Sequence, residues 1–195
     1  MTAAVLASVQ RSSDPSPWLL RWAHLIPAAG SVLDVAAGSG RHTRWLAGRG
    51  HAVTAVDRDA AAMAALGPVA ETVVADIELD AWPLSGRRFA AVVVTNYLWR
   101  PTLPSVVAAV DQGGVLLYET FAIGQESVGR PANPQFLLAP GELLAAAAGL
   151  RIVAYEDGFL DDPARFVQRI AAVRDAGSAL APRHALDGRA VPPVR

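Results

Sequence analysis

Three aspartates, each at or just after an apolar run, are well placed to hold a ligand. They are Asp34, Asp57 and Asp76, and a carboxylate can accept hydrogen bonds from the hydroxyl or amino groups of a bound molecule. Gly38 and Gly40 lie between the first two aspartates. Because glycine has no Cβ and readily adopts positive φ, a small ligand can lie directly against such a turn.

The segments around these residues predict a strand, a tight turn and a helix. Residues 31–35 form a buried strand, and residues 41–47 form a helix whose free N–H groups point at the same ligand. The second acid follows the apolar run 52–56. A nucleotide-binding α/β fold places the carboxylate that binds a ribose at this position.

The pattern Asp34-x-x-x-Gly38-x-Gly40, then Val56-Asp57 and Val74-Ala75-Asp76, resembles the class I S-adenosylmethionine-dependent methyltransferases. In that family the glycine loop lies along the methionine part of the cofactor. The acid after the second strand binds the ribose hydroxyls, and the acid after the third binds the adenine amino group. The resemblance covers roughly residues 15–175, and in size and layout the chain is similar to the small tellurite-resistance and thiopurine-type enzymes.

The resemblance implies that the cofactor is S-adenosylmethionine. The glycine loop departs from the family at one position, since the family often has glycine where this chain has Ala36. The residues expected to bind the cofactor are Asp34, Ala36, Gly38, Gly40, Asp57, Arg58, Asp76, Ile77 and Asn96.

A nicotinamide-dependent oxidoreductase is the main alternative, because an NAD-binding fold also has glycines after its first strand and an acid after its second. Its fingerprint requires a third small residue three places after the second glycine, where this chain has Thr43 between His42 and Arg44. Asp34 and Asp76 have no standard function in that fold. We therefore favour the methyltransferase; a cofactor-binding regulatory subunit without catalysis is a further alternative.

Methyl transfer is an in-line displacement, so the protein must align the acceptor with the methyl group, and it needs a base only if the acceptor keeps a proton. The expected catalytic residues are Asn96 and Tyr97, after the fourth apolar run, and Glu119, after the fifth. Tyr97 is either an aromatic wall near the sulfonium or a packing residue. Glu119 is either a base or a scaffold carboxylate paired with Arg100 or Arg130.

The long irregular segment 120–138 predicts a lid over the substrate, since loops of this length are usually functional or disordered. We expect Arg130 and Asn133 to contact the substrate, and Arg100 with Arg130 to bind an acceptor that is anionic. The Asn-Pro-Pro-Tyr or Asp-Pro-Pro-Tyr tetrad that amino-group methylating enzymes often carry is absent after the fourth run, so such an acceptor is not indicated. His42 is expected to be a packing residue, and the scattered histidines predict no metal site.

The periodicity predicts an α/β protein: a Rossmann-like, seven-stranded, mostly parallel sheet with an antiparallel C-terminal hairpin strand and helices on both faces. The expected strands are 31–35, 52–56, 72–75, 89–95, 115–119, 151–156 and 166–173, with helices from about 17, 41, 60, 101 and 140. Residues 1–176 are expected to form the methyltransferase domain and residues 177–195 a flexible tail.

Composition narrows the function further. With 195 residues, 52% of them hydrophobic, the chain suits one domain with a sheet buried on both faces. The net charge of −1 indicates no general attraction to nucleic acid, and the lack of cysteine excludes disulfides, zinc fingers and iron–sulfur clusters. No signal peptide or membrane span is recognised. We expect a cytoplasmic enzyme, a monomer or homodimer, that acts on a small molecule, with RNA or protein as alternative acceptors.

Overall fold

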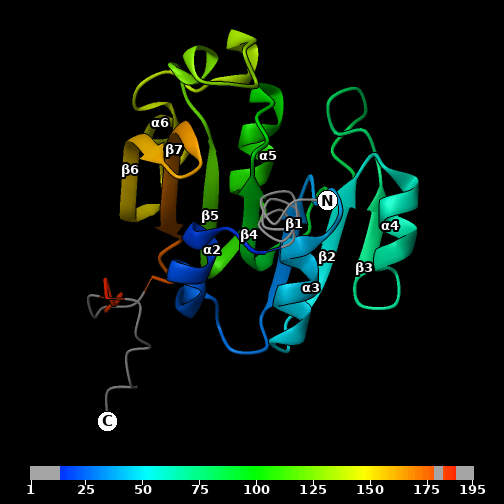
Figure 1. Cartoon of the computed structure of the whole chain (residues 1–195). Helices are drawn as coiled ribbons and strands as arrows, with labels where there is room; N and C mark the ends of the chain where they lie inside the picture. Colours follow the sequence, from blue (N-terminus) through cyan, green and yellow to red (C-terminus); the bar gives the residue numbers. More distant parts are fainter. Residues whose placement is uncertain (1–13, 178–181, 188–195) are drawn as a thin grey trace.

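A computed structural model describes residues 14–177 and 182–187, which form a mixed sheet flanked by helices (Figure 1). Most of the expected tail, 177–195, lies outside the described residues. The strands are β1 (Ser31–Val35), β2 (Ala52–Asp57), β3 (Glu71–Val74), β4 (Phe89–Thr95), β5 (Val110–Phe121), β6 (Arg151–Asp161) and β7 (Ala164–Val173). The helices are α2 (Pro17–Trp22), α3 (Arg41–Gly48), α4 (Ala60–Leu66), α5 (Leu103–Ala108) and α6 (Glu142–Ala146), with 3-10 turns η1 (Ala23–Leu25), η2 (Arg100–Thr102), η3 (Gln125–Ser127) and η4 (Pro134–Phe136).

The sheet has the predicted seven strands, and their order is β3-β2-β1-β4-β5-β7-β6. The first five strands along the chain pair in parallel, and β7 runs antiparallel to both of its neighbours, β5 and β6. The antiparallel closing strand separates this sheet from an all-parallel dinucleotide-binding one. The predicted Rossmann-like fold class is therefore confirmed.

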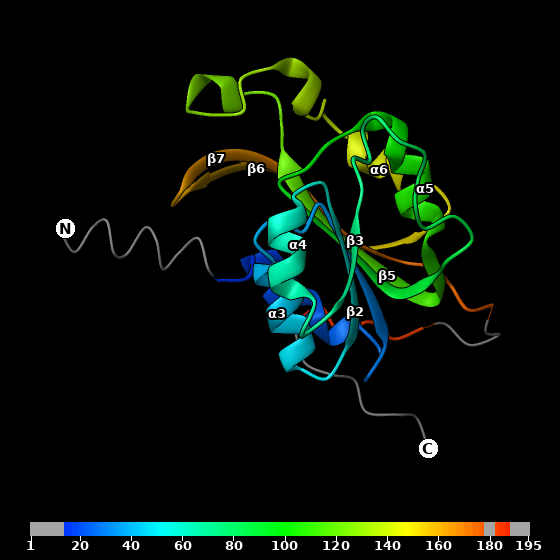
Figure 2. The same cartoon turned by 90° about the vertical axis from the view of Figure 1, so that its right-hand side faces the viewer.

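Helices cover both faces of the sheet, which Figure 2 shows nearly edge-on. On one face, α2 and α3 bury Trp18, Trp22 and Leu46 against apolar side chains of the central strands, and α4 adds Met63 beside them. On the other face, α5 and α6 cover a second apolar cluster that includes Phe89. Alternate residues of each strand therefore face opposite helix layers, as the two-residue period of a strand requires.

The strand order reverses between β1 and β4, and this reversal determines where a ligand can bind. The chain passes outward from β1 through β2 to β3, then returns to place β4 on the other side of β1. The crossovers diverge at that point, which opens a crevice at the carboxyl ends of the strands. The parallel register brings Val35, Val56 and Val94 level with one another, so the residues that follow them meet at this edge.

Two strands are longer than their sequence patterns predict. β6 continues through residues 157–161, for which a turn is expected, because β6 is an edge strand and an exposed edge tolerates the polar run Glu156-Asp157-Gly158. β5 begins at Val110 rather than at 115, with Gly113 at φ +74° near an irregularity in its pairing with β4. In the described part of the chain, no helix is long and apolar enough to cross a membrane.

Candidate functional site

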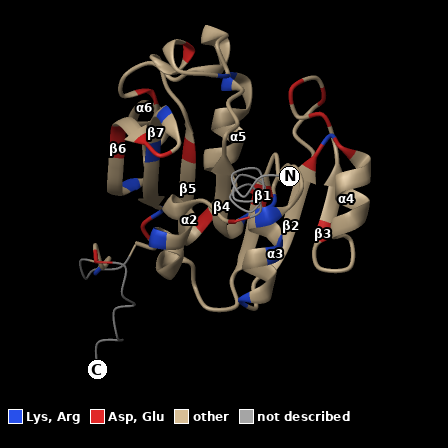
Figure 3. Ribbon diagram, viewed as in Figure 1, with Lys and Arg blue, Asp and Glu red and all other residues tan. Residues whose placement is uncertain are grey.

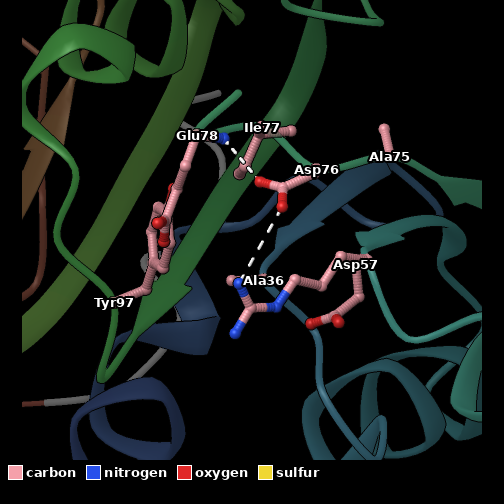
Figure 4. Close-up of a pocket in the computed structure, with 8 residues that line it drawn as sticks. Ala36, Asp57, Ala75, Asp76, Ile77, Glu78 and Tyr97 are labelled. Atoms are coloured by element: carbon pink, nitrogen blue, oxygen red, sulfur yellow. Dashed lines mark hydrogen bonds and ion pairs between the residues drawn. The ribbon is translucent and has the colours of Figure 1, made fainter. Parts of the chain in front are cut away.

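A cavity of about 270 Å³ lies at the carboxyl ends of the parallel strands (Figure 4). We call it the first cavity; Ala36, Asp57, Arg58, Ala75, Asp76, Ile77, Glu78 and Tyr97 line it. The structure thus brings together most of the residues that the sequence predicts around the cofactor. They come from the loops that follow β1, β2, β3 and β4, so strand register rather than sequence proximity assembles the site.

Asp57 lines this cavity, and both of its carboxylate oxygens accept hydrogen bonds from the backbone. The backbone N–H of Gly38 donates to Oδ2 at 2.8 Å, and the N–H of Asp59 donates to Oδ1 at 2.9 Å. Each oxygen can accept a further hydrogen bond. The carboxylate is therefore oriented by the backbone and still able to receive the two hydroxyls of a ribose.

Asp76 is held in a similar way at the end of β3. Its Oδ1 accepts a hydrogen bond from the N–H of Glu78 at 3.0 Å, and its Oδ2 lies 3.8 Å from a guanidinium nitrogen of Arg58. Both contacts are drawn in Figure 4. Because the Arg58 side chain is 71% exposed, this ion pair contributes little to stability, and the carboxylate can accept from an adenine amino group.

The first cavity is rich in acid. Asp57, Asp76 and Glu78 line it against Arg58 alone, and Figure 3 shows acidic residues along the loop that follows β3. Such a lining favours a cationic ligand and disfavours the pyrophosphate of a dinucleotide, because like charges in a partly enclosed site repel strongly. The charges therefore favour S-adenosylmethionine, whose sulfonium is positive, over NAD.

The glycine loop turns through three residues in the left-handed region: Ala36 at φ +53°, Gly38 at φ +54° and Gly40 at φ +77°. A Cβ added at Gly38 would meet no atom within 4 Å, so its backbone faces open space. A Cβ at Gly40 would lie 2.4 Å from the side chain of Leu66, so glycine there lets α4 pack closely. Gly38 therefore leaves room for a ligand beside the loop, and Gly40 leaves room for the side chain of Leu66 in the core.

We expect Ala36→Gly to raise the free energy of unfolding by roughly 0.5–1 kcal/mol, since the left-handed strain of alanine outweighs the extra entropy of glycine in the unfolded chain. Ala37→Gly is the matched control. Ala37 is buried, and φ is not positive there, so that change should lower the same free energy. Urea unfolding of both variants measures the two effects, and a loss of stability in Ala36→Gly would contradict the prediction.

Asp34 lies behind the loop rather than in the first cavity. Its side chain is only 1% exposed and accepts a hydrogen bond from the hydroxyl of Thr43 at 2.6 Å, which ties β1 to the first turn of α3. Burial raises the pKa of Asp34 from 3.8 to about 6, although the hydrogen bonds from Thr43 oppose the shift. The carboxyl thus supports the loop from beneath, and its predicted contact with the cofactor stays a prediction.

This raised pKa predicts a pH-dependent effect of Asp34→Asn. Because the folded protein holds the proton more tightly, the carboxyl contributes most stability below pH 3.8 and loses that contribution as the pH rises through about 6. Asparagine cannot ionise and keeps an oxygen for Thr43. We expect the free energy of unfolding of the variant, relative to the parent, to increase by about 1–3 kcal/mol between about pH 4 and pH 7. Urea unfolding across that range measures it, and a constant difference would contradict it.

Asn96 and Tyr97 directly follow β4 and have different environments. Tyr97 lines the first cavity; its hydroxyl is buried without a hydrogen-bond partner in the described structure, and burial raises its pKa above the ordinary value. A phenol that ionises less readily is not suited to act as a base. Tyr97 lines the cavity and also packs against the core, so both of its predicted roles stay predictions. Asn96 is exposed at φ +56°, and its N–H donates to the carbonyl of Glu119 at 2.9 Å, joining the ends of β4 and β5.

Glu119 is 1% exposed and belongs to a network of its own. It accepts a hydrogen bond from the Ser16 hydroxyl at 2.9 Å and lies 3.3 Å from Arg169 and 3.7 Å from Arg165. The expected pairing with Arg100 or Arg130 is wrong, because β7 pairs antiparallel with β5 and places Arg169 directly opposite Glu119. Arg169 also bonds Glu156 of β6 at 2.6 Å, so it joins two carboxylates across three strands.

The predicted substrate residues of the loop do not line the first cavity. Arg100 uses its guanidinium to bind both oxygens of Glu142, at 2.7 and 2.9 Å, and the carbonyls of Gln135 and Leu137. Its donors therefore anchor the segment before α6. Arg130 is exposed, and Asn133 is exposed and caps η4 by accepting from the N–H of Gln135. The lid function of segment 120–138 stays a prediction.

A second cavity of about 450 Å³ contains residues that sequence reasoning missed. It is lined by Asp14, Pro15, Ser16, Pro17, Arg41, Glu119, Leu160, Asp162, Pro163, Arg165 and Arg169. Two signals were available in the sequence. Arg41 directly follows the glycine loop. Arg165 directly precedes the predicted strand 166–173 and Arg169 lies in it, four residues further on, so the two share a face if the strand begins one residue earlier. The contact between Ser16 and Glu119, by contrast, joins residues 103 positions apart and has no local signal.

His42 packs between these regions, as expected. It is 4% exposed, and its Nε2 lies 3.2 Å from the N–H of Ser16. Burial lowers the pKa of His42 to about 4, with a smaller contribution from Arg41. A neutral imidazole can accept the hydrogen bond from that N–H, so His42 joins the start of α2 to the start of α3.

Comparison with known proteins finds one family-model match. Residues 32–113, less than half of the chain, match the family model described as a methyltransferase domain, and a sequence search of curated proteins gives no match. The matched segment runs from β1 to β5 and contains the glycine loop and the residues that line the first cavity. This part of the chain is therefore similar to a methyltransferase domain.

Solved structures share the fold at low sequence identity. TehB from Haemophilus influenzae is 22% identical with a TM-score of 0.64; the match covers 80% of this chain and 61% of TehB, so the chain spans less than two thirds of that protein. A TehB-like SAM-dependent methyltransferase from Corynebacterium glutamicum is 20% identical (TM-score 0.62, 87% and 94% covered). A SAM-dependent methyltransferase from Methanosarcina mazei is 14% identical (TM-score 0.62, 83% and 99% covered).

Proposed function

We propose that this chain is an S-adenosylmethionine-dependent methyltransferase that transfers the methyl group to a small-molecule acceptor. The observation that carries the proposal is the pair of cavities at the two ends of the glycine loop. Ala36, at the start of the loop, lines the acid-rich first cavity, and Arg41, just after its end, lines the second. Their volumes, about 270 and 450 Å³, are of the size that small-molecule sites have. The first cavity suits the adenosyl part of the cofactor and the second an acceptor.

The residues present have distinct tasks in such a reaction. Bound S-adenosylmethionine supplies a methyl group on a cationic sulfur, which is a good leaving group for an in-line displacement. We assign Asp57 to the ribose hydroxyls, Asp76 to the adenine amino group and the Tyr97 ring to the cavity wall. Holding two reactants in line can lower a barrier by about 7–11 kcal/mol. Where the acceptor atom carries a proton, we assign its removal to Glu119, which lines the second cavity.

A macromolecular acceptor is less well supported. The formal net charge is −1, so the chain lacks the surplus of positive charge that draws proteins to RNA. In the described residues, the β6–β7 hairpin carries both basic and acidic residues (Figure 3). We further propose that residues 1–176 form the catalytic domain of a cytoplasmic monomer or homodimer, since the cofactor is made and used in the cytosol.

Calorimetric titration tests the proposal directly. The purified protein is titrated with S-adenosylmethionine, S-adenosylhomocysteine and NADH. We expect the first two to bind and NADH not to bind. Binding of NADH alone would overturn the proposal. Transfer of a labelled methyl group from S-adenosylmethionine into a pool of small metabolites, but not into RNA or protein, separates the small-molecule acceptor from its alternatives.

A further inference from the structure

The second cavity contains three guanidinium groups whose hydrogen-bonding capacity is used very unequally. Arg169 is fully engaged: it pairs with Glu119 and Glu156, and its guanidinium lies 4.9 Å from the centre of the Trp18 ring. Its task is to hold β5, β7, β6 and α2 together. It therefore has little left to offer a ligand.

Arg165 is only partly satisfied. A terminal nitrogen lies 3.7 Å from Glu119, which is an ion-pair distance but too long for a hydrogen bond. Its side chain is only 14% exposed, and its buried Nε has no hydrogen-bond partner among the residues that the structure describes. A buried donor without a partner is costly, so an acceptor atom that reached this nitrogen would bind favourably.

Arg41 is the least engaged of the three. Within residues 14–177 and 182–187 it makes no hydrogen bond and no ion pair, yet it is half-buried in the cavity wall. Burial lowers the pKa of Arg41, with Arg165 adding to the shift and Glu119 opposing it. A partly buried guanidinium without a partner presents its planar set of donors to whatever enters the cavity, and that geometry matches a carboxylate.

We infer that the methyl acceptor carries a carboxylate, which Arg41 and Arg165 bind in the second cavity. The inference rests on the proposed methyl transfer and names the acceptor class for that site. A monoanion fits better than a phosphate dianion, because Asp14, Glu119 and Asp162 line the same cavity and offset the three arginines. The carboxylate is an anchor rather than the methylated group, since two guanidinium groups withdraw the electron density that a nucleophile needs.

The cofactor has a carboxylate of its own, so the test must separate the two sources. The probes are benzoate and its neutral isostere benzamide, titrated by NMR into the protein with and without S-adenosylhomocysteine. We expect benzoate to bind in both states and benzamide to bind at least about tenfold more weakly. Arg41→Gln and Arg165→Gln should each weaken benzoate binding by about tenfold or more and leave the affinity for S-adenosylhomocysteine within about twofold.

Arg49→Gln is the matched control, because Arg49 is exposed just beyond the other end of α3 and should leave both affinities unchanged. Since Arg41 makes no hydrogen bond or ion pair with the described part of the chain, the fold should persist in Arg41→Gln. Equal benzoate binding in parent and variants would overturn the inference. So would a loss of S-adenosylhomocysteine affinity in Arg41→Gln with unchanged affinity for 5′-methylthioadenosine, which lacks the carboxylate. Failure of the parent to bind S-adenosylhomocysteine would instead contradict the proposed function. The benzoate titration of the cofactor-free protein would still test whether Arg41 and Arg165 bind a carboxylate.

Discussion

Asp57→Ala is expected to weaken the binding of S-adenosylmethionine by at least about a hundredfold, because two hydrogen bonds to a charged carboxylate are lost together. The effect has a second source in this structure. The same carboxylate accepts from the N–H groups of Gly38 and Asp59, so its removal also frees the glycine loop that faces the cofactor. Calorimetric titration of parent and variant measures the change.

The control is Asp80→Ala, which removes an acid from the same side of the molecule. Asp80 is exposed and does not line the first cavity, so its loss should change the affinity by less than about threefold, as expected for a screened surface charge. Asp57→Asn adds a second comparison, since it keeps the size of the side chain and one acceptor oxygen. Parent-like affinity in Asp57→Ala would show that the ribose lies elsewhere.

Trp18→Ala is expected to lower the free energy of unfolding by about 3–5 kcal/mol, the cost typical of removing a buried tryptophan. The side chain is 2% exposed, packs on Trp22 with ring centroids 5.6 Å apart, and donates from Nε1 to the carbonyl of Ile170 at 3.1 Å. Its loss leaves a cavity between α2 and the sheet and a carbonyl without that partner. Since domains are stable by only about 5–15 kcal/mol, this one change is severe.

Leu20→Ala, two residues along the same helix, is the control. Leu20 is 47% exposed, so its truncation should cost no more than about 0.5 kcal/mol. Urea unfolding of the parent and both variants gives the comparison. Similar losses in the two variants would mean that α2 does not pack on the sheet through Trp18.

The fold and the first cavity were largely predictable because both depend on local patterns. Each strand end is marked by an acid or a polar residue after an apolar run, and parallel strands bring such ends to one edge. Asp57, Asp76 and Tyr97 could therefore be grouped from sequence alone. The switch from parallel to antiparallel at β7 was readable from the alternating pattern of 166–173.

The environment of Glu119 was not predictable because it depends on long-range register. Arg100 and Arg130 are closer to Glu119 in sequence than Arg169 is, yet Arg100 bonds Glu142 instead. Only the pairing of β5 with β7 places Arg169 opposite Glu119. Ser16, 103 residues away, completes the network because α2 packs across the same face. Side-chain contacts between distant strands have no signature in a single sequence.

The glycine loop runs from the first cavity to the second, so it can couple the binding of the cofactor to the binding of the acceptor. Asp57 holds the loop through Gly38, and Arg41 follows it directly, so a cofactor that tightens the loop also positions the guanidinium. Binding at the two sites is then coupled, and coupling of binding free energies is reciprocal: each ligand raises the affinity of the other by the same factor. Each ligand would then be held more tightly while the other is present, so the complex that holds both is favoured over either complex with one.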